Sequence, residues 1–455
     1  EVTEAMRSIK SAADPHNLLN PKKMFDAPPM DTHLRYGEEY RVNVWNSALH
    51  FEHERGLAGA IEHCNGQGVC RKTSGVMCPS FQVTRDEMFS TRGRSNLLRA
   101  LITRPQTVDG GRSTVNRLSS SVFESLDLCL VCKGCTSECP SGVDMPKLKY
   151  EFMNEHYKTH RRHLRDYLFG YFHVVSKWLT PIAPLANAFM KMNWSRELIA
   201  GAMGITDKRP FPLFVGSKQV NTYTPASGQA EKKKVIFLSD VFSRYLEPQV
   251  EQAAFDILHA AGYEVKVLPI IGAGASLLSK GFIDAARRYA EKVLAEIKLI
   301  DGGAGLSVVG CEPPEVYCLK HEYVALLPER RVEIESITKK VWLVDEFLLR
   351  ADVISDLPVA TLGSSDMKIT FHPHCHQRAE GLADDGLPAG TSATVAMLRA
   401  FGFEVDLIEA GCCGMAGTFG YDAEHYELSM QVGELGVLPK ARMAENLVST
   451  GAACR

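Results

Sequence analysis

Long apolar runs are missing from this chain of 455 residues. No stretch reaches about 18 uninterrupted apolar residues, which argues against a membrane-spanning helix. Residues 1–25 form an amphipathic pattern without the apolar core of a secretory signal. A basic excess is missing too, because 51 lysines and arginines stand against 54 acidic residues, and this balance argues against a nucleic-acid partner. We therefore expect a cytoplasmic protein whose partners are proteins and small molecules.

Cysteines are not abundant, but most of them are clustered. The chain has 13 cysteines. Three tight groups hold ten of them: Cys64, Cys70 and Cys78; Cys129, Cys132, Cys135 and Cys139; and Cys375, Cys412 and Cys413. Disulfide frameworks are typical of small secreted domains, so this clustering indicates metal ligation in a reducing compartment.

The second group has the complete spacing of a bacterial ferredoxin motif. LDLCLVCKGCTSECPSG (126–142) contains C-x2-C-x2-C-x3-C-P, in which three cysteines hold one cluster and the fourth reaches the other cluster of a pair. Soft thiolate ligands favour iron–sulfur clusters or zinc. Because a zinc site would need two separated pairs, the spacing predicts [4Fe-4S] clusters.

The same crossover rule interprets the first group, HCNGQGVCRKTSGVMCP (63–79). Its last cysteine precedes a proline and is expected to join the downstream motif. The predicted ligands of cluster A are Cys78, Cys129, Cys132 and Cys135, and those of cluster B are Cys64, Cys70 and Cys139.

Cluster B would then have only three thiolates, because Gln67 stands where the second ligand of the usual run would be. We expect either a [3Fe-4S] form or a [4Fe-4S] form with one iron held by water, Gln67 or His63. The alternative is that the first motif is vestigial and that a single cluster forms.

Two basic segments accompany these motifs. TRDEMFSTRGRSNLLRALI (84–102) is predicted to be a helix, in which Arg92 and Arg94 either raise the reduction potential of the nearer cluster or form a solvated or docking face. The stretch from 160 to 178 is basic and then aromatic. A helix packed between domains is the favoured interpretation, and contact with a membrane surface near a quinone is the alternative.

Strands and helices alternate after residue 234. Strands are predicted at 235–240 and 263–270, and helices at 248–262 and 282–300. ILHAAGYEVKVLP (257–269) aligns without gaps with MLRAFGFEVDLIE (397–409), and Phe237 then aligns with Phe371. We infer an internal duplication.

The second copy is the cysteine-rich one. The alignment sets Cys413 opposite Ala273, and we expect Cys311 to correspond to Cys454. A tentative third site therefore comprises Cys375, Cys412, Cys413 and Cys454, gathered at one end of the sheet. It would be a metal or unusual iron–sulfur site, and the alternatives are structural zinc or buried thiols. The histidines of the same loop either ligate, relay protons or lie on the surface: His372, His374 and His376.

The predicted fold class is α/β plus α, with a helical ferredoxin-like bis-cluster domain followed by a duplicated α/β cysteine-rich domain. The expected segments are a tail of another domain (1–25), a connector (26–55), the ferredoxin-like domain (56–150), a helical linker (151–230), repeat 1 (231–345) and repeat 2 (346–455).

Together these motifs resemble the iron–sulfur part of FAD-linked 2-hydroxy acid dehydrogenases, the group of D-2-hydroxyglutarate and D-lactate dehydrogenases. Related proteins are glycolate oxidase iron–sulfur subunits, the anaerobic glycerol-3-phosphate dehydrogenase small subunit and the cysteine-rich subunit of heterodisulfide reductase. The resemblance rests on CNGQGVCRKTSGVMCPSFQVTRDE, STRGR, LCLVCKGCTSECP, GCEPPEV and GCCGMAGTFGY. The chain departs from these cysteine-rich subunits in three ways. It has Gln67 in the first cluster motif, and its first repeat lacks the Cys-Cys pair. It also ends at Arg455, directly after Cys454, where related chains usually continue.

The resemblance implies an electron-transfer role. SIKSAADPHNLLNPKKMF (8–25) is similar to the end of an FAD-linked oxidase domain, which would place Asn20 near a flavin. FAD itself is expected in a missing domain or a partner chain, so this chain alone should not oxidise a hydroxy acid. Its electrons would pass to a quinone, an electron-transfer flavoprotein or another carrier, with the protein free in the cytoplasm or peripheral on the inner membrane face. The alternatives are a heterodisulfide-reductase-like module with chemistry at the Cys-Cys-Gly site and a zinc-stabilised interaction protein without redox function.

Overall fold

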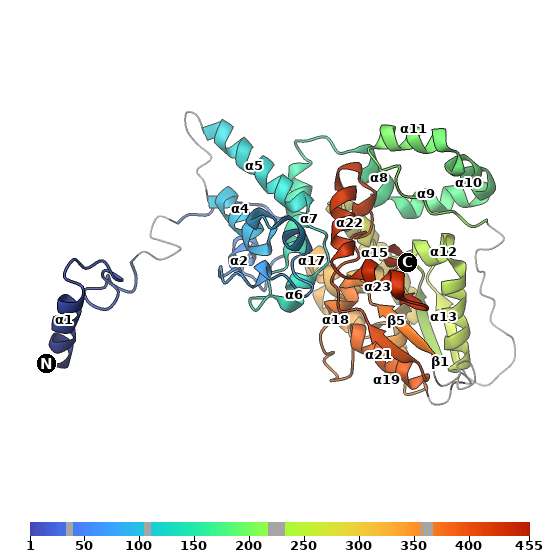
Figure 1. Cartoon of the computed structure of the whole chain (residues 1–455). Helices are drawn as coiled ribbons and strands as arrows, with labels where there is room; N and C mark the ends of the chain where they lie inside the picture. The colour runs from blue at the N-terminus through green and yellow to red at the C-terminus, as the bar shows by residue number, and fades with distance from the viewer. Residues whose placement is uncertain (33–39, 104–110, 217–232, 355–356, 358–366) are drawn as a thin grey trace.

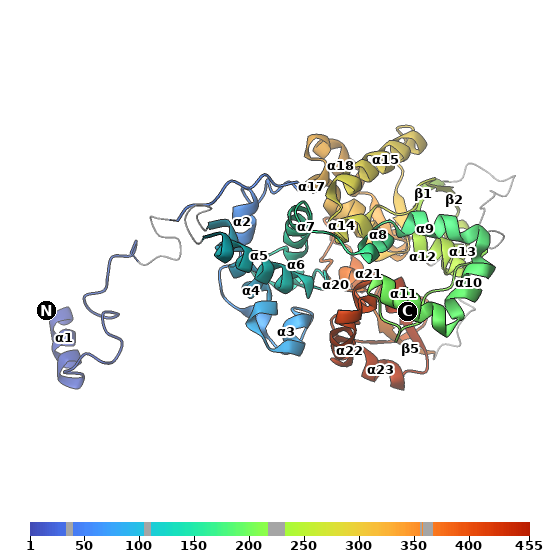
Figure 2. The same ribbon diagram turned by 90° about the horizontal axis from the view of Figure 1, so that it is seen from above.

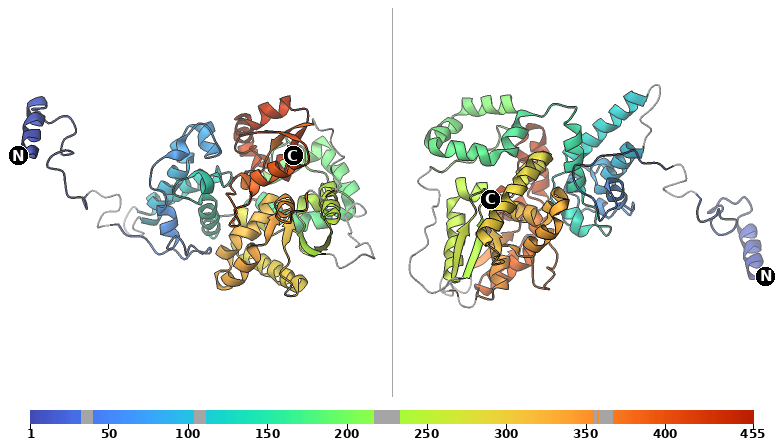
Figure 3. Two further views of the ribbon diagram at one scale, coloured as in Figure 1. Left: turned by 90° about the horizontal axis from the view of Figure 1, so that it is seen from below. Right: turned by 180° about the vertical axis from the view of Figure 1, so that it is seen from behind.

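The computed structural model describes residues 1–32, 40–103, 111–216, 233–354, 357 and 367–455, with the backbone alone for 111–116. Its first helix, α1 (Val2–Ala13), lies apart from the rest in every view of Figures 1 and 3. Asp14 ends this helix and accepts hydrogen bonds from the backbone N–H groups of Leu18 and Leu19 at 2.8 and 2.9 Å. Asn20 follows in an exposed turn, and its proximity to a flavin stays a prediction.

The cysteine-rich segment folds as a helical domain. Its elements are α2 (Leu57–Glu62), η1 (Val69–Arg71), α3 (Pro79–Thr84), η2 (Glu87–Phe89), α4 (Thr91–Thr103), α5 (Gly111–Asp127), α6 (Gly134–Glu138) and α7 (Met145–His156). The predicted single helix over 84–102 is wrong. Arg85 adopts a left-handed conformation that ends α3, and Asp86 caps the short η2 before α4 starts.

The second half of the chain contains two small parallel sheets. One contains β1 (Lys233–Leu238), β2 (Tyr263–Val267), β3 (Val308–Gly310) and β4 (Val341–Leu343) in the order β2-β1-β3-β4. The other contains β5 (Lys368–His372), β6 (Glu404–Leu407) and β7 (Leu447–Ser449) in the order β6-β5-β7. The predicted mixture of helical and α/β structure is therefore confirmed.

Helices connect and cover these strands. Around the first sheet they are α12 (Val241–Tyr245), α13 (Pro248–Ala260), α14 (Ala275–Ser279), α15 (Ile283–Asp301), α16 (Pro313–Tyr317), η5 (Cys318–Glu322), α17 (Tyr323–Leu326), η6 (Pro328–Arg330), α18 (Arg331–Thr338) and α19 (Val344–Arg350). Around the second sheet they are α20 (Cys375–Arg378), α21 (Gly390–Ala400), η9 (Phe419–Tyr421), η10 (Ala423–His425), α22 (Tyr426–Glu434), α23 (Val437–Met443) and η11 (Ala452–Cys454).

Strand pairing supports the internal duplication. Phe237 pairs with Val267 across β1 and β2, and Phe371 pairs with Leu407 across β5 and β6, as the gapless alignment requires. The third strands match as well, because Phe237 faces Val309 and Phe371 faces Val448.

This register corrects one predicted correspondence. Since Val309 corresponds to Val448, the counterpart of Cys311 is Thr450, and the counterpart of Cys454 is Glu315. The prediction that Cys311 matches Cys454 is therefore wrong. The prediction paired the first cysteine after each third strand. It did not take into account how many residues separate each cysteine from the paired strand positions Val309 and Val448.

A layer of helices lies beside the two sheets: α8 (Leu164–Gly170), α9 (Phe172–Leu179), η3 (Thr180–Ile182), α10 (Ala183–Lys191) and α11 (Asn193–Met203). Figures 1 and 2 show α9, α10 and α11 along one side of the α/β region. Arg165 of α8 fixes the layer to repeat 2 through ion pairs with Asp422, at 3.1 Å, and Glu424. Among the helices that the structure describes, none is both long and apolar enough to cross a membrane.

Candidate iron–sulfur and cysteine-rich sites

The four cysteines predicted for cluster A surround one small cavity. Its walls include Cys78, Cys129, Cys132 and Cys135, together with Arg94 and Met145. All four cysteines are buried, although Cys78 lies about fifty residues before Cys129 in the sequence. Cys78 precedes α3, Cys129 and Cys132 lie in the loop after α5, and Cys135 lies in α6. Four soft sulfur donors around a buried cavity fit an iron–sulfur cluster.

The long gap between Cys70 and Cys78 is accommodated by a loop bound to α6. Glu138 accepts hydrogen bonds from the backbone N–H groups of Val76 and Met77 at 2.8 and 3.0 Å. Lys72 forms an ion pair with the same carboxylate. Because Glu138 lies between Cys135 and Cys139 in sequence, this contact ties the first cysteine motif to the second.

Arg94 supplies a buried positive charge beside cluster A. Its side chain is 1% exposed, and its guanidinium donates hydrogen bonds to Cys78 Sγ at 3.2 Å, Ser80 Oγ at 3.0 Å and the Ser125 carbonyl at 2.9 Å. Burial alone would lower the pKa of Arg94, but the charges of Cys78 and Cys129 raise it overall. The sequence left two roles open for this arginine, and its contacts with the cysteine site favour the electrostatic one.

The three cysteines predicted for cluster B share one hydrophobic core. Cys64 and Cys70 are buried, and Cys70 Sγ accepts a hydrogen bond from the Arg92 backbone N–H at 3.3 Å. Cys139 ends α6 and packs, partly buried, against the core that contains the other two cysteines. The ligand set of cluster B stays a prediction.

The two candidate non-cysteine ligands of cluster B, Gln67 and His63, are exposed. The Gln67 backbone N–H donates to Asn65 Oδ1 at 3.0 Å, and the adjacent glycines, Gly66 and Gly68, have φ angles of 82°. This tight turn carries Gln67 at the surface of the loop.

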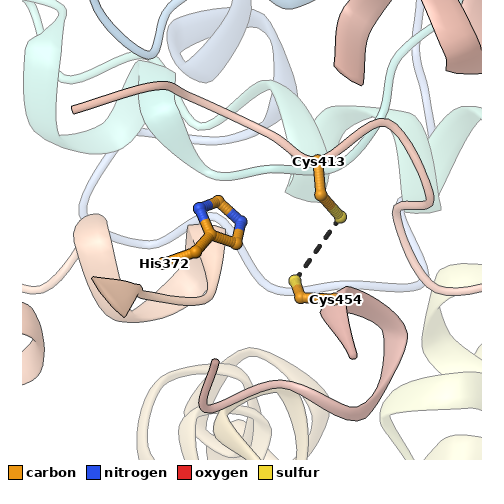
Figure 4. A group of neighbouring side chains, drawn as sticks. All are labelled: His372, Cys413 and Cys454. Carbon is orange, nitrogen blue, oxygen red and sulfur yellow. Dashed lines mark hydrogen bonds between the residues drawn. The ribbon is translucent and has the colours of Figure 1, made fainter. Parts of the chain in front are cut away.

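The tentative third site lies where the three strands of the second sheet end. Cys375 begins α20 after β5, Cys412 and Cys413 follow β6, and Cys454 lies in η11 after β7. Cys413 Sγ and Cys454 Sγ are 3.4 Å apart. Ligand atoms of His372, Cys413 and Cys454 all lie within 4.8 Å of one another. Figure 4 shows these three side chains together. Two thiols and an imidazole form a donor set suited to zinc or another thiophilic metal.

The sulfur atoms of this site polarise one another. A hydrogen bond from Cys412 holds the pKa of Cys375 well below its usual value, and hydrogen bonds from Cys412 and Cys454 lower the pKa of Cys413 in the same way. A lowered pKa favours the thiolate form, which is the form of cysteine that binds a metal cation.

The three histidines differ in position. His372 and His374 are buried, so the surface alternative is wrong for them. His374 Nε2 lies 4.0 Å from Cys375 Sγ. His374 Nδ1 caps α20 by accepting a hydrogen bond from the His376 backbone N–H. His376 Nε2 lies 2.8 Å from the Val131 carbonyl, in the loop that contributes cysteines to cluster A. Among the described histidines of this loop, His372 is the one that groups with Cys413 and Cys454 as a candidate metal ligand.

The loop of cluster A adjoins both repeats. Cys132 shares one buried apolar cluster with Cys375 and Cys412 of repeat 2. Lys133, the next residue, forms a buried ion pair with Glu322 of repeat 1. The shared apolar cluster thus connects the loop with repeat 2, and the ion pair connects it with repeat 1.

Several buried polar groups escaped the sequence analysis. Lys149 Nζ donates to the Cys129 carbonyl at 2.8 Å. Burial raises the pKa of Glu312 to about 8 and that of Glu315 to about 7. The GCEPPEV motif contains both glutamates, so the signal was present, but nothing in the motif tells that their side chains are buried.

The first comparison identifies the class of the helical domain. Residues 60–143 match the model of the 4Fe-4S dicluster domain. The match spans the cysteines of both predicted clusters, and a 4Fe-4S dicluster domain is therefore present in this chain.

Homologous proteins are oxidoreductases or their subunits. The chain is 26% identical to D-2-hydroxyglutarate dehydrogenase of Pseudomonas putida, over 100% of this chain and 47% of that protein. It is 28% identical to a subunit of the anaerobic glycerol-3-phosphate dehydrogenase of Escherichia coli, over 61% of this chain and 68% of that protein. It is 25% identical to the glycolate oxidase iron-sulfur subunit of Escherichia coli, over 82% of each chain. The predicted resemblance is confirmed, and the chain spans about half the length of the D-2-hydroxyglutarate dehydrogenases that it matches.

Proposed function

We propose that this chain is the electron-transfer part of a flavin-dependent dehydrogenase that oxidises a D-2-hydroxy acid, D-2-hydroxyglutarate or D-lactate, to the 2-oxo acid. FAD would reside in a further domain or a partner chain and take the hydride from the substrate. This chain would carry the electrons to an acceptor. Support comes from the similarity to D-2-hydroxyglutarate dehydrogenases along the whole chain and to two separate iron–sulfur or dehydrogenase subunits.

The observation that carries this proposal is the position of Cys132. It lines the cavity of cluster A and belongs to the same buried apolar cluster as Cys375 and Cys412 of the third site. Electron transfer requires neighbouring redox sites, whereas a structural zinc site has no need of this proximity. The shared cluster supports the proposal that the two predicted sites would serve as consecutive electron carriers.

The residues present fit iron–sulfur clusters, which accept and release electrons one at a time. Cys78, Cys129, Cys132 and Cys135 would hold cluster A, and Cys64, Cys70 and Cys139 would contribute to cluster B. Arg94 would compensate the negative charge of the thiolates and of an added electron, because its guanidinium contacts Cys78 directly. The apolar surroundings of Cys132, including Leu130 and Phe419, would keep water away from the boundary with the third site.

Metal analysis of anaerobically purified protein tests the cofactor class. We expect iron and acid-labile sulfide in comparable amounts, and an EPR signal after reduction by dithionite. A three-iron signal after mild oxidation would support the three-cysteine assignment of cluster B. Two clusters with four cysteine ligands each would contradict that assignment, and zinc without sulfide would contradict the proposed function as a whole.

The substrate requires the complete enzyme with its flavin part. Anaerobic addition of D-2-hydroxyglutarate should produce the EPR signal of reduced clusters, and D-lactate is the paired test compound. A signal with glycerol 3-phosphate or glycolate, and with neither D-2-hydroxy acid, would contradict the substrate proposal but leave the electron-transfer role intact.

A further inference from the structure

A large cavity adjoins the dicluster domain, the helical layer and both repeats. Its volume is about 920 Å³, within the range of about 300–1,000 Å³ that is typical of small-molecule sites. Cys129, from the cluster A motif, and Cys375, from the third site, both line it. A ligand in this cavity would therefore lie beside both predicted redox sites.

One wall of the cavity is apolar and aromatic. The helical layer and the segment after it contribute Leu168, Phe169, Phe172, Val175, Phe211 and Phe214. The outer side of the same layer is also apolar, because Trp178 is 77% exposed and Leu185 is 71% exposed. A hydrophobic ligand would thus meet apolar surface both outside and inside this layer.

The other wall contains charged groups, and four of its six lysine and arginine side chains are paired with carboxylates. These pairs are Lys133 with Glu322, Arg165 with Asp422, Lys280 with Asp166, and Arg455 with Glu247. Of the other two, Lys149 donates to the Cys129 carbonyl at 2.8 Å and Arg209 to Ser429 Oγ at 2.9 Å. Nucleotide cofactors carry phosphates that call for uncommitted basic groups or backbone N–H cradles. The cavity therefore suits a neutral ligand.

We propose that this cavity binds a lipid-soluble quinone as the electron acceptor of the chain, a ligand with a flat apolar ring and two carbonyl oxygens. This inference rests on the proposed function and identifies the acceptor class. Conversion of one quinone to the quinol consumes two electrons, which the dicluster domain would supply, and two protons from solvent. Glu312 would pass these protons, because its carboxyl group lines the cavity; one of its oxygens accepts a hydrogen bond from the Ala452 backbone N–H at 3.0 Å.

Equilibrium binding of tetramethyl-1,4-benzoquinone to the oxidised, cluster-containing protein tests the site without turnover. This quinone has no free ring carbon for thiols to attack. Val175→Trp fills the apolar wall and is expected to weaken binding at least about tenfold, or about 1.4 kcal/mol. Val174→Trp is the matched control. Val174 precedes Val175 in α9 and is 41% exposed, so this variant should leave quinone binding unchanged.

A second pair of variants covers the case in which Val175→Trp does not fold. Leu168 lines the cavity, and Leu164, one turn earlier in α8, is 64% exposed. Leu168→Trp should weaken binding, and Leu164→Trp should not. Equal binding by both members of a folded pair would overturn the proposal, and so would binding of FMN in preference to the quinone.

Iron and sulfide content of the same samples separates the two levels of inference. Normal clusters without quinone binding in the wild-type protein would overturn the acceptor site and leave the proposed function standing. Absence of clusters would overturn the proposed function, whatever the cavity binds.

Discussion

Repeats 1 and 2 have different residue types at two equivalent positions, one after the second strand and one after the third strand. In repeat 1, Glu315 accepts hydrogen bonds from the backbone N–H groups of Ala273, at 2.5 Å, and Ala275, at 3.3 Å. In repeat 2 the corresponding residues are Cys454 and Cys413, whose sulfur atoms lie 3.4 Å apart. The glycine turn of each repeat has the same left-handed residue, with φ of 88° at Gly274 and 89° at Gly414.

This difference separates what the scaffold needs from what the site needs. The turn after the second strand can be held by a carboxylate bound to backbone N–H groups, as repeat 1 shows. The helix after the first strand can likewise be capped by Asp240 in repeat 1 and by His374 in repeat 2. Repeat 1 thus forms the same turn and the same helix start without thiols or imidazoles at these positions, so their concentration in repeat 2 favours a chemical role.

The largest expected effect comes from giving repeat 2 the residue of repeat 1. Cys413→Ala introduces the residue that Ala273 provides in repeat 1, and it removes one of three neighbouring metal donors. We expect this variant to abolish metal binding at the proposed third site, with the EPR signals of the dicluster domain unchanged. Metal content per chain, measured by mass spectrometry of the elements, checks this outcome.

Cys311→Ala is the control for that variant, because it removes a thiol from repeat 1, next to the strand end at Gly310. It should leave the metal content unchanged. If Cys413→Ala retained all its metal, or if Cys311→Ala lost the same amount, the two repeats would not differ in function.

Glu315 should make repeat 1 sensitive to pH. Burial raises the pKa of this carboxyl from 4.5 to about 7 in the folded protein, despite its hydrogen bonds and with Asp240 adding to the rise. A raised pKa means that the folded state binds the proton more tightly. The resulting stability is therefore complete below pH 4.5 and is lost as the pH rises toward 7.

The variant Glu315→Gln should remove that dependence and keep an acceptor for the Ala273 N–H. Between pH 5.5 and 7.5 the free energy of unfolding of the wild-type protein should fall by about 2 kcal/mol more than that of the variant. Urea unfolding at both pH values measures this difference. Glu434→Gln, on an exposed ion pair of repeat 2, should behave like the wild type, and an unchanged slope in Glu315→Gln would place the titration elsewhere.

Much of this comparison was accessible from the sequence, because apolar periodicity and the gapless alignment are local properties. They predicted β1, β2, β5 and β6 and the equivalence of Phe237 with Phe371. The cysteine spacing also predicted that Cys78 would approach the downstream motif, since the crossover rule specifies which cluster each ligand joins.

The rest depended on tertiary contacts that no local pattern encodes. The equivalence of Glu315 with Cys454 follows from strand register, and a glutamate does not resemble a cysteine in an alignment. The Lys133–Glu322 pair joins residues 189 positions apart. The cavity lies between the dicluster domain, the helical layer and the two repeats. In the sequence, the apolar residues of each of these parts indicate only that part's own packing.

Arg94, which lines the cavity of cluster A together with Cys132, should produce a smaller effect. Arg94→Gln removes a buried positive charge in contact with Cys78, so the reduced cluster loses stabilisation. We expect the midpoint potential of cluster A to fall by about 60 mV, equivalent to about 1.4 kcal/mol for one electron. Arg94→Lys should restore part of this shift, and EPR-monitored redox titration measures it. Equal potentials in the glutamine and lysine variants would show that packing, and not charge, is responsible.

The smallest expected effect tests the boundary between cluster A and repeat 2. His376 lies 2.8 Å from the Val131 carbonyl, and burial lowers its pKa to about 4, so the neutral imidazole donates this hydrogen bond at pH 7. His376→Gln, which weakens the bond, should change the cluster A potential by less than the shift of about 60 mV expected for Arg94→Gln. Phe242 occupies the corresponding position in repeat 1, and Phe242→Leu should leave the potential unchanged. An equal shift in both variants would mean that the cluster responds to general loosening of the α/β region. A shift confined to His376→Gln would show that cluster A is coupled to repeat 2 through this contact.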